Sequence, residues 1–387
     1  MKTREVKLGE VANVKGGKRI PKGIGLINIP NGHPYIRVRD LNNKRLLELD
    51  NSYEYVDNET QKVISKYTVK TGDVVLSIVG TIGLVAIVGR TLDGANLTEN
   101  CVKLSSFHGV NRDFLYYYLR SDCGQQEIRC GTVGAVQAKL PIKNIQNIAI
   151  NLPDYTTQER IASLLLSIDR KIELNQKIND NLQQQAMALY AEMFLNSSNN
   201  DVTSGTLSDI AVITMGQSPS GSSYNEDGVG EVFYQGRAEF GFRFPKRRLF
   251  TTEPKRMAVA GDVLLSVRAP VGDLNMAYER CCIGRGLGAI HSKTGHSSFV
   301  LYTMFALRSQ LNVFNGEGTV FGSINRDALN AIPIDVPLVT KIDQFEAVAH
   351  PIDELIRTNY EENCRLEAIR NSLLPKLMSG EIDVSAI

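Results

Sequence analysis

Two stretches of this 387-residue sequence are close copies of each other: GDVVLSIVGTIG at residues 72–83 and GDVLLSVRAPVG at residues 261–272. In each stretch a Gly-Asp turn precedes a short run of β-branched and other apolar residues, which is typical of a buried strand. The same strand therefore occurs at two points of the chain, and this indicates an internal repeat.

Three further matched pairs flank these strands in the same order in both halves. They are KLGEVANVKGG (7–17) with TLSDIAVITMG (206–216), GTV (131–133) with GTV (318–320), and NLP (151–153) with DVP (335–337). The offset between partners falls from 199 to 184 residues along the chain, as insertions and deletions would cause. Matching aromatic runs at 114–122 and 299–310 predict short helices whose rings pack in a core. We infer a duplicated unit with a mixed α/β region in each copy.

Each mixed region is followed by a predicted long helix. Positions at alternating steps of four and three from Ile161 to Met193 are mostly apolar, and the same pattern returns 184 residues later, from Phe345 to Leu377. Two Asn residues interrupt the apolar series at matching places in both copies. This spacing is the signature of a coiled coil. We expect the two helices to pair antiparallel and to relate the two units by a pseudo-twofold axis. The residues predicted to pair the helices are Ile168, Ile172, Asn175, Asn179, Leu182, Ile352, Ile356, Asn359, Asn363 and Leu366.

Local signals predict where these helices begin and end. Thr157 is expected to cap the first helix, which runs to about Leu195 and is followed by a polar hinge, NSSNNDVTSG, at residues 196–205. Pro351 is expected to break or kink the second helix, and Pro375 and Gly380 to mark its end. The predicted fold class is α+β, with mixed regions at 1–154 and 201–337 and helices within 155–200 and 338–387.

The formal charge of +1 is unevenly distributed along the chain. Residues 1–151 carry +7, whereas residues 152–200 and 336–387, which contain the predicted helices, carry −2 and −4. Basic clusters at residues 7–48 (+6) and 237–256 (+5) are interleaved with aromatic residues and glycines. Such loops suit contact with phosphates and base edges, although one cluster alone is equally well explained as a solvated surface. Two clusters in duplicated units favour DNA.

Motifs for catalysis, metals and membranes are missing from the sequence. GRGLG at residues 284–288 has no acidic partner downstream and is interpreted as a strand turn, and Pro254 spoils the strand that a Glu253–Lys255 nuclease pair would need. The sequence has no GxSxG elbow, phosphate loop, NPPY or DPPY motif, and its cysteines and histidines lack zinc spacing. No apolar run predicts a membrane span or secretory signal, so we expect a cytoplasmic binding protein with free thiols.

Four stretches carry a family resemblance: GQSPSGSSYN from Gly216, TTEPKRMAVAGDVLLSVRAPVG from Thr251, CCIGRGLGAI from Cys281 and LLPKLMSGEIDV from Leu373. With the repeated order of globular region and helix, the whole chain resembles the specificity subunit of type I restriction–modification systems. The resemblance implies that residues 1–154 and 201–337 are target recognition domains, each reading one half of a split site in double-stranded DNA. The helices would act as spacers between them.

The resemblance also implies partners. The subunit would be non-catalytic and would bind no cofactor. It would dock two adenine methyltransferase subunits that use S-adenosylmethionine, and motor-nuclease subunits would join through the complex. A coiled-coil scaffold without DNA specificity is the alternative, and an autonomous methyltransferase is disfavoured by the missing motifs.

The candidate DNA contacts are basic and polar residues of the two mixed regions. Arg and Gln can form bidentate contacts with guanine and adenine, but most of the Lys and Arg residues are expected on phosphates. The candidates in the first region are Lys15, Lys18, Arg19, Arg37, Arg39, Lys44 and Arg45. Those in the second are Gln217, Ser218, Ser222, Tyr224, Gln235, Arg237, Arg243, Lys246, Arg247, Arg248, Arg268 and Arg285.

Overall fold

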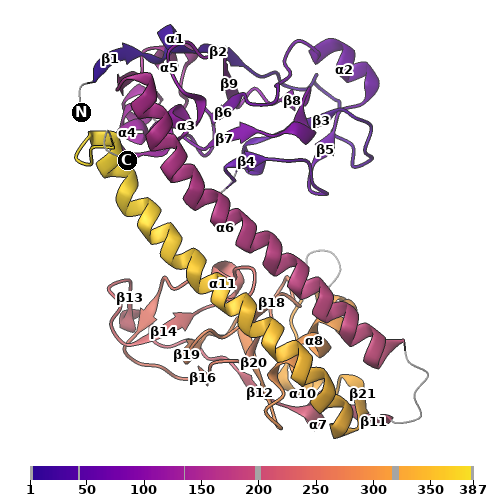
Figure 1. Ribbon diagram of the computed structural model, residues 1–387. Coiled ribbons are helices and arrows are strands. Elements are labelled where there is room, and N and C mark those ends of the chain that lie inside the picture. The colour runs from indigo at the N-terminus through magenta and orange to yellow at the C-terminus, as the bar shows by residue number, and fades with distance from the viewer. Residues whose placement is uncertain (1–2, 42–43, 135, 197–201, 316–321, 385–387) are drawn as a thin grey trace. The chain divides into compact units, whose positions relative to one another are not determined.

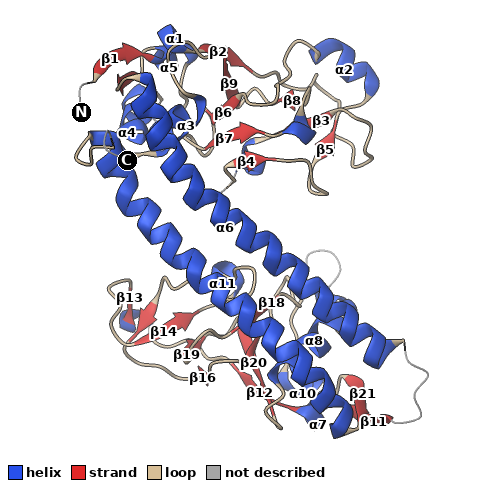
Figure 2. Ribbon diagram, in the orientation of Figure 1, coloured by secondary structure: helices blue, strands red, loops and turns tan. Residues whose placement is uncertain are grey.

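The computed structural model describes residues 3–41, 44–134, 136–196, 202–315 and 322–384 (Figure 1). The chain divides into two compact units, each of mixed helix and strand content (Figure 2). Unit 1 comprises Met1–Glu173 and Asn363–Ile387, and unit 2 comprises Leu174–Glu362. The second GTV copy, at 318–320, and residues 197–201 of the predicted hinge lie outside the described residues.

The described residues of unit 1 form three small sheets. The largest has the strand order β2 (Asn13–Gly16), β9 (Cys101–Ser105), β6 (Val74–Ser77), β7 (Val85–Val88), β4 (Leu46–Leu47). The second has the order β5 (Glu54–Tyr55), β3 (Pro34–Ile36), β8 (Asn96–Leu97), and the third pairs β1 (Arg4–Lys7) with β10 (Ala149–Leu152). The short helices are α1 (Leu8–Val11), α2 (Asn58–Ile64), α3 (Arg112–Arg120), α4 (Asp122–Gly131) and α5 (Ile142–Gln146).

In unit 2 the part that the structure describes also forms three sheets. The first has the order β12 (Ala211–Met215), β20 (Leu287–Ser292), β17 (Val263–Ser266), β18 (Leu274–Met276). The second has the order β13 (Tyr224–Asn225), β15 (Phe250–Thr251), β14 (Glu231–Tyr234), β19 (Cys281–Ile283), β16 (Met257–Ala258), and the third pairs β11 (Val202–Thr206) with β21 (Pro333–Pro337). The short helices are α7 (Leu207–Ile210), α8 (Ser297–Ala306), α9 (Arg308–Asn312) and α10 (Arg326–Asn330).

The two units share one topology. β2, β9, β6 and β7 of unit 1 have the same order as β12, β20, β17 and β18 of unit 2. In both units one parallel pair lies in the second sheet, β3 with β8 and β14 with β19. β6 and β17, which come from the two copies of the GDV(V/L)LS stretch, are fully buried, as the apolar runs predict.

The aromatic helices α3 and α8 are buried in their units. Asn111 caps α3 by accepting hydrogen bonds from the amides of Asp113 and Phe114. The rings of Tyr117 and of Tyr302 in α8 are almost wholly inaccessible. The prediction that these aromatic residues pack in a core is confirmed, which excludes base stacking by their rings.

The two long helices are α6 (Tyr155–Tyr190) and α11 (Val339–Ser379), and a π-helical turn (Ala191–Leu195) follows α6. The predicted cap at Thr157 is wrong, because the helix begins at Tyr155. Asp154 accepts hydrogen bonds from the amide and hydroxyl of Thr157, at 3.0 and 2.6 Å, so its carboxylate is the cap. Asp is among the residues that best satisfy the free amides of a first turn.

The predicted break at Pro351 is also wrong, because α11 continues through it to Ser379. Pro351 lacks the N–H that would bond the carbonyl of Ala347, but both residues are exposed, so water can satisfy that carbonyl. The neighbouring Ala349 and Asp353 are buried. Packing on both sides of the proline holds the helix together.

Each unit has its own apolar core, and both long helices contribute to each. In unit 1, Ile161 and Leu165 of α6 lie in one cluster with Leu377 of α11. In unit 2, Ala186 of α6 lies in one cluster with Phe345 of α11. The helix ends are therefore structural parts of the units.

Candidate nucleic-acid interface

In unit 1, three segments meet at the carboxyl ends of the parallel strands β3 and β8. Ile36 pairs with Leu97 across the two strands, and the amide of Thr98 donates to the carbonyl of Ile36 at 3.0 Å. The loop after β2 joins them, because the amide of Lys18 donates to the carbonyl of Leu97 at 2.8 Å. Residues 18, 19, 37 and 99 therefore lie at one edge, and we call this set the first platform.

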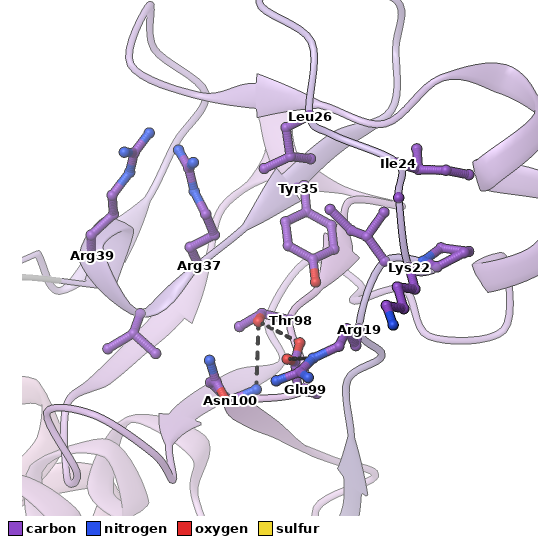
Figure 3. Close-up of a pocket in the computed structure, with 14 residues that line it drawn as sticks. Arg19, Lys22, Ile24, Leu26, Tyr35, Arg37, Arg39, Thr98, Glu99 and Asn100 are labelled. Carbon is purple, nitrogen blue, oxygen red and sulfur yellow. Dashed lines mark hydrogen bonds and ion pairs between the residues drawn. The ribbon is translucent and has the colours of Figure 1, made fainter.

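A pocket of about 520 Å³ opens at the first platform (Figure 3). Its lining contains four cationic side chains and one carboxylate around an apolar and aromatic wall. The lining residues are Arg19, Ile20, Pro21, Lys22, Gly23, Ile24, Leu26, Tyr35, Arg37, Val38, Arg39, Thr98, Glu99 and Asn100. This excess of positive charge suits a polyanion.

Carboxylates hold three of these cations. Arg19 donates to Glu99 at 2.5 Å (Figure 3), and Arg37 and Arg39 both pair with Glu54. Burial, the largest single influence, raises the pKa of Glu99, but the hydrogen bonds from Arg19, the backbone and Thr98 together with the charge of Arg19 outweigh it, so the pKa of the carboxyl is lowered. Arg37 is only 20% exposed, whereas the side chain of Arg19 is 79% exposed. Arg19 is thus the most open of the paired arginines.

Asp40 binds the backbone of the segment that carries Arg37, and its raised pKa predicts how stability changes with pH. Its carboxylate accepts the amide of Arg37 at 2.7 Å, and burial raises its pKa from 3.8 to about 6 although Arg39 and Lys44 oppose the shift. The folded state therefore binds the Asp40 proton more tightly than the unfolded state does. Protonation of Asp40 stabilises the fold fully below about pH 4, and this stabilisation is lost as the pH rises through about 6. Asp40→Asn should flatten this part of the pH dependence in urea unfolding, and an unchanged slope would contradict it.

In unit 2, the three equivalent segments meet at the carboxyl ends of β14 and β19. The amide of Gly284 donates to the carbonyl of Tyr234 at 2.8 Å, and the amide of Gln217 donates to the carbonyl of Ile283 at 2.9 Å. The amide of Arg285 donates to the hydroxyl of Ser218 at 3.2 Å. We call residues 217, 218, 235 and 285 the second platform.

The backbone hydrogen bonds make the two platforms equivalent position by position. Lys18 corresponds to Gln217, Arg37 to Gln235, and Glu99 to Arg285, because each occupies the same place relative to the parallel pair. Gly17 and Gly216, which the sequence repeat aligns, precede the platforms, and a Cβ on either would lie 2.1 Å from a carbonyl oxygen. The same scaffold therefore presents different side chains in each unit.

The other predicted DNA contacts in unit 2 lie mostly at the surface. Exposed side chains belong to Gln217, Ser222, Gln235, Arg237, Lys246, Arg247, Arg248, Arg268 and Arg285. Some are ion-paired: Arg237 with Asp273, Arg247 with Glu279, and Arg248 with Glu239. Ser218 and Tyr224 are half-buried, and the Tyr224 ring packs against Phe233. In unit 1, Lys15, Lys18, Arg19, Arg39 and Lys44 are exposed.

Two predicted DNA contacts lie elsewhere. The Arg45 guanidinium makes two hydrogen bonds, of 2.7 and 2.9 Å, to Glu173 of α6, and its side chain is 12% exposed. The Arg243 side chain is 2% exposed and contacts Asp353 of α11 at 2.5 Å. Neither guanidinium is available to a phosphate, so these assignments are corrected. The charge clusters suggested them because a count of charges does not show which way a side chain points.

Arg45 and Arg243 occupy equivalent positions, since their carbonyls accept the amides of Ile87 and Met276 at 2.8 Å. A second duplicated contact lies beside them: the hydroxyls of Tyr117 and Tyr302 donate to Asp169 and Asp353, at 2.7 and 2.9 Å. Each unit thus ties its globular part to a long helix through arginine and tyrosine. The sequence offered one signal of this, because Asp169 and Asp353 are separated by the same 184 residues as the two heptad patterns.

The predicted helix-pairing residues are buried or half-buried in their units. In unit 2, Asn359 donates to Asn179 at 2.8 Å and Asn175 donates to Glu362 at 2.7 Å. The partner number falls as the residue number rises, so α6 and α11 run in opposite directions there. In unit 1, Ile168, Ile172 and Asn363 are buried and Leu366 is half-buried. In unit 2, Ile356 is buried and Leu182 and Ile352 are half-buried.

The sequence did not point to Glu99, Glu54 or Lys22. Glu99 belongs to the first platform, Lys22 lines its pocket and Glu54 pairs with Arg37. The stretch around Glu99 shares no motif with CCIGRGLGAI, so no alignment of the repeats pointed to it. Within the described ranges, no helix is long and apolar enough to cross a membrane. No group of three or more His, Cys, Asp or Glu is placed to hold a metal ion in those ranges.

Comparison with known proteins gives consistent matches. Residues 2–184 match the family described as "Type I restriction modification DNA specificity domain". The chain is 28% identical over 382 residues to "Putative type I restriction enzyme MjaX specificity subunit" of Methanocaldococcus jannaschii, covering 91% of this chain and 88% of that protein. It is 20% identical over 385 residues to the type I restriction enzyme MjaIX specificity subunit of the same organism, with coverages of 92% and 88%.

A solved structure shares the fold. The crystal structure of the type I restriction-modification system S subunit from M. genitalium aligns with 97% of this chain and 96% of that chain, at 16% identity and a TM-score of 0.57. Residues 2–184 are thus similar to the type I DNA specificity domain, and the chain is similar over nine-tenths of its length to proteins named type I restriction enzyme specificity subunits.

Proposed function

We propose that this chain reads a two-part sequence in double-stranded DNA, one part with each platform, and that it docks adenine methyltransferase subunits. Residues 1–154 and 201–337 are the reading domains, and the helices within 155–200 and 338–387 set the gap between the two parts. Catalysis, S-adenosylmethionine binding and DNA translocation belong to the methyltransferase and motor-nuclease partners.

One observation carries this proposal: the same backbone scaffold occurs in both units with different side chains at the equivalent positions. A protein that needs two copies of one function would be expected to keep the side chains similar. Lys18, Arg37 and Glu99 differ in charge from Gln217, Gln235 and Arg285. Different hydrogen-bonding patterns on one scaffold are what two different half-sites require.

The helix contacts support the spacer role. The pairs Asn179–Asn359 and Asn175–Glu362 are polar contacts between two helices whose heptad positions are mostly apolar. Polar pairs at such positions cost stability but fix the register of the two helices. A fixed register gives a fixed spacing, which a two-part reader needs.

Binding of the full chain with its methyltransferase partner to DNA fragments tests the proposal. We expect selective binding that weakens steeply with salt, because Lys and Arg contacts to phosphates release counterions. Lys246→Ala should weaken binding to every fragment alike and reduce the salt slope by about one. Equal affinity for all fragments would contradict the proposal and favour a scaffold without DNA specificity.

The spacer role predicts a change in the DNA gap on helix lengthening. One heptad inserted after Glu173 in α6, and one after Glu362 in α11, falls at the boundary between the units. The contacts within each unit stay intact, and a heptad adds about 10 Å, or roughly three base pairs. Methylation mapping should show the gap about three base pairs longer with both half-sites unchanged.

A heptad in α6 alone is the matched control, because it shifts one helix against the other and should abolish methylation. The same gap after the double insertion would contradict the spacer role.

A further inference from the structure

Glycines fix the geometry of the second platform. A Cβ on Gly284 would lie 2.9 Å from the Cα of Gln235, and a Cβ on Gly286 would lie 2.8 Å from the carbonyl oxygen of Gln235. The atoms that each Cβ would approach belong to the backbone of Gln235, so no flexible side chain could move aside to make room. The Cα atoms of Gln235 and Arg285 are therefore held at a set separation on one edge.

Three side chains leave this edge, those of Gln217, Gln235 and Arg285. Gln217, Gln235 and Arg285 are exposed, and none of the three side chains makes a hydrogen bond or ion pair within the described part of the chain. Nearby Arg237 and Arg248, by contrast, are paired with Asp273 and Glu239. Two amides and one guanidinium remain open for contact on a rigid support.

The equivalent positions of the first platform carry different chemistry. Arg37 stands where Gln235 does, and Glu99 stands where Arg285 does. In the major groove a Gln amide matches the edge of adenine, an Arg fork matches that of guanine, and a carboxylate accepts from the amino group of cytosine. Arg in place of Gln at the first position, and Glu in place of Arg at the second, would each match a different base.

We propose that Gln235 and Arg285 determine the specificity of unit 2, Gln235 by reading an adenine and Arg285 a guanine in the same half-site. Arg37 and Glu99 hold the equivalent positions in unit 1. The exposed Lys246 contacts a phosphate and positions the platform without selecting bases. This inference rests on the proposed function, because it assigns bases to the DNA-reading site that the proposed function requires.

The test maps methylated motifs in a host that carries the full chain as its only specificity subunit. Arg285→Ala should relax one G·C position of one half-site, with a loss of discrimination of roughly 5- to 150-fold there and none elsewhere. Arg285→Lys keeps the charge but loses the fork, so it should relax the same position. Gln235→Arg should change an A·T position of that half-site to G·C.

Arg280→Ala is the matched control. Arg280 precedes β19, at the opposite end of that strand from Arg285, and is 64% exposed. Its motif should equal that of the unaltered chain.

The outcomes separate the two proposals. An unaltered chain that directs no two-part motif overturns the proposed function. A two-part motif that stays unchanged in Arg285→Ala, or full activity of Arg285→Lys beside a uniformly weakened Arg285→Ala, overturns the base-reading inference alone.

Discussion

Replacing Asp353 with alanine is expected to lower the free energy of unfolding of unit 2 by about 3–5 kcal/mol. The Arg243 guanidinium is almost fully buried and has Asp353 as its one ionic partner in the described residues. Without that carboxylate, the buried charge keeps hydrogen bonds to Gln183 and the Tyr302 hydroxyl and lies over the rings of Tyr302 and Phe305, and none of these groups carries a compensating negative charge. Urea unfolding followed by hydrogen exchange of unit 2 amides measures the loss.

Two controls isolate the buried charge from the loss of side-chain volume. Arg243→Met combined with Asp353→Leu removes both charges and should restore most of the stability. Glu354→Ala changes an exposed neighbour on α11 and should shift stability by no more than about 0.5 kcal/mol. If Asp353→Ala is as stable as Glu354→Ala, the buried pair does not hold unit 2 to its helix.

Gly216→Ala is expected to abolish base selection by unit 2. A Cβ there would lie 2.1 Å from the carbonyl oxygen of Gly284, closer than any relaxed contact, so the segments of the second platform must separate. Gln235 and Arg285 would then lose their fixed spacing. Two bidentate contacts of about 1–3 kcal/mol each predict at least a 30-fold loss of discrimination for one half-site.

Gly221→Ala is the control for this change, because a Cβ at Gly221 meets nothing within 4 Å and the glycine does not have a positive φ. Competition binding against DNA varied in one half-site at a time measures both variants. Equal selectivity of the Gly216 and Gly221 variants would show that the close approach at Gly216 does not support the reading surface.

The repeat and the long helices could be predicted because their signals are periodic. The GDV(V/L)LS copies form β6 and β17, and the heptad positions of α6 and α11 are buried or half-buried. Burial imposes apolar residues at a fixed spacing, and this leaves a pattern in the sequence. The break predicted at Pro351 was wrong because the helix-breaking tendency of proline is local, whereas packing of the neighbouring residues keeps α11 continuous.

The direction of charged side chains could not be predicted. Arg243 stands in FRF within a basic run, and charge counting placed it on the DNA surface. In the structure the neighbouring Phe244 is buried too, whereas Phe242 is exposed. Whether an arginine points inward depends on a carboxylate more than a hundred residues away, Asp353, which no local pattern reveals.

The platforms were only partly predictable for the same reason. Arg37 and Glu99 become neighbours through a parallel pairing of two very short strands, β3 and β8. Strands of two or three residues show no alternation that would fix their register. The equivalence of Arg37 with Gln235 follows from backbone hydrogen bonds alone.

The central claim, a two-part DNA reader that directs methylation, is tested most directly by the adenine methylome of the host with this gene deleted and then restored. Deletion should remove methylation at one motif made of two short half-sites separated by a fixed gap. Restoration should return that motif, and restoration with Gly216→Ala should return it with one half-site relaxed. A methylome that is unchanged by deletion would contradict the account.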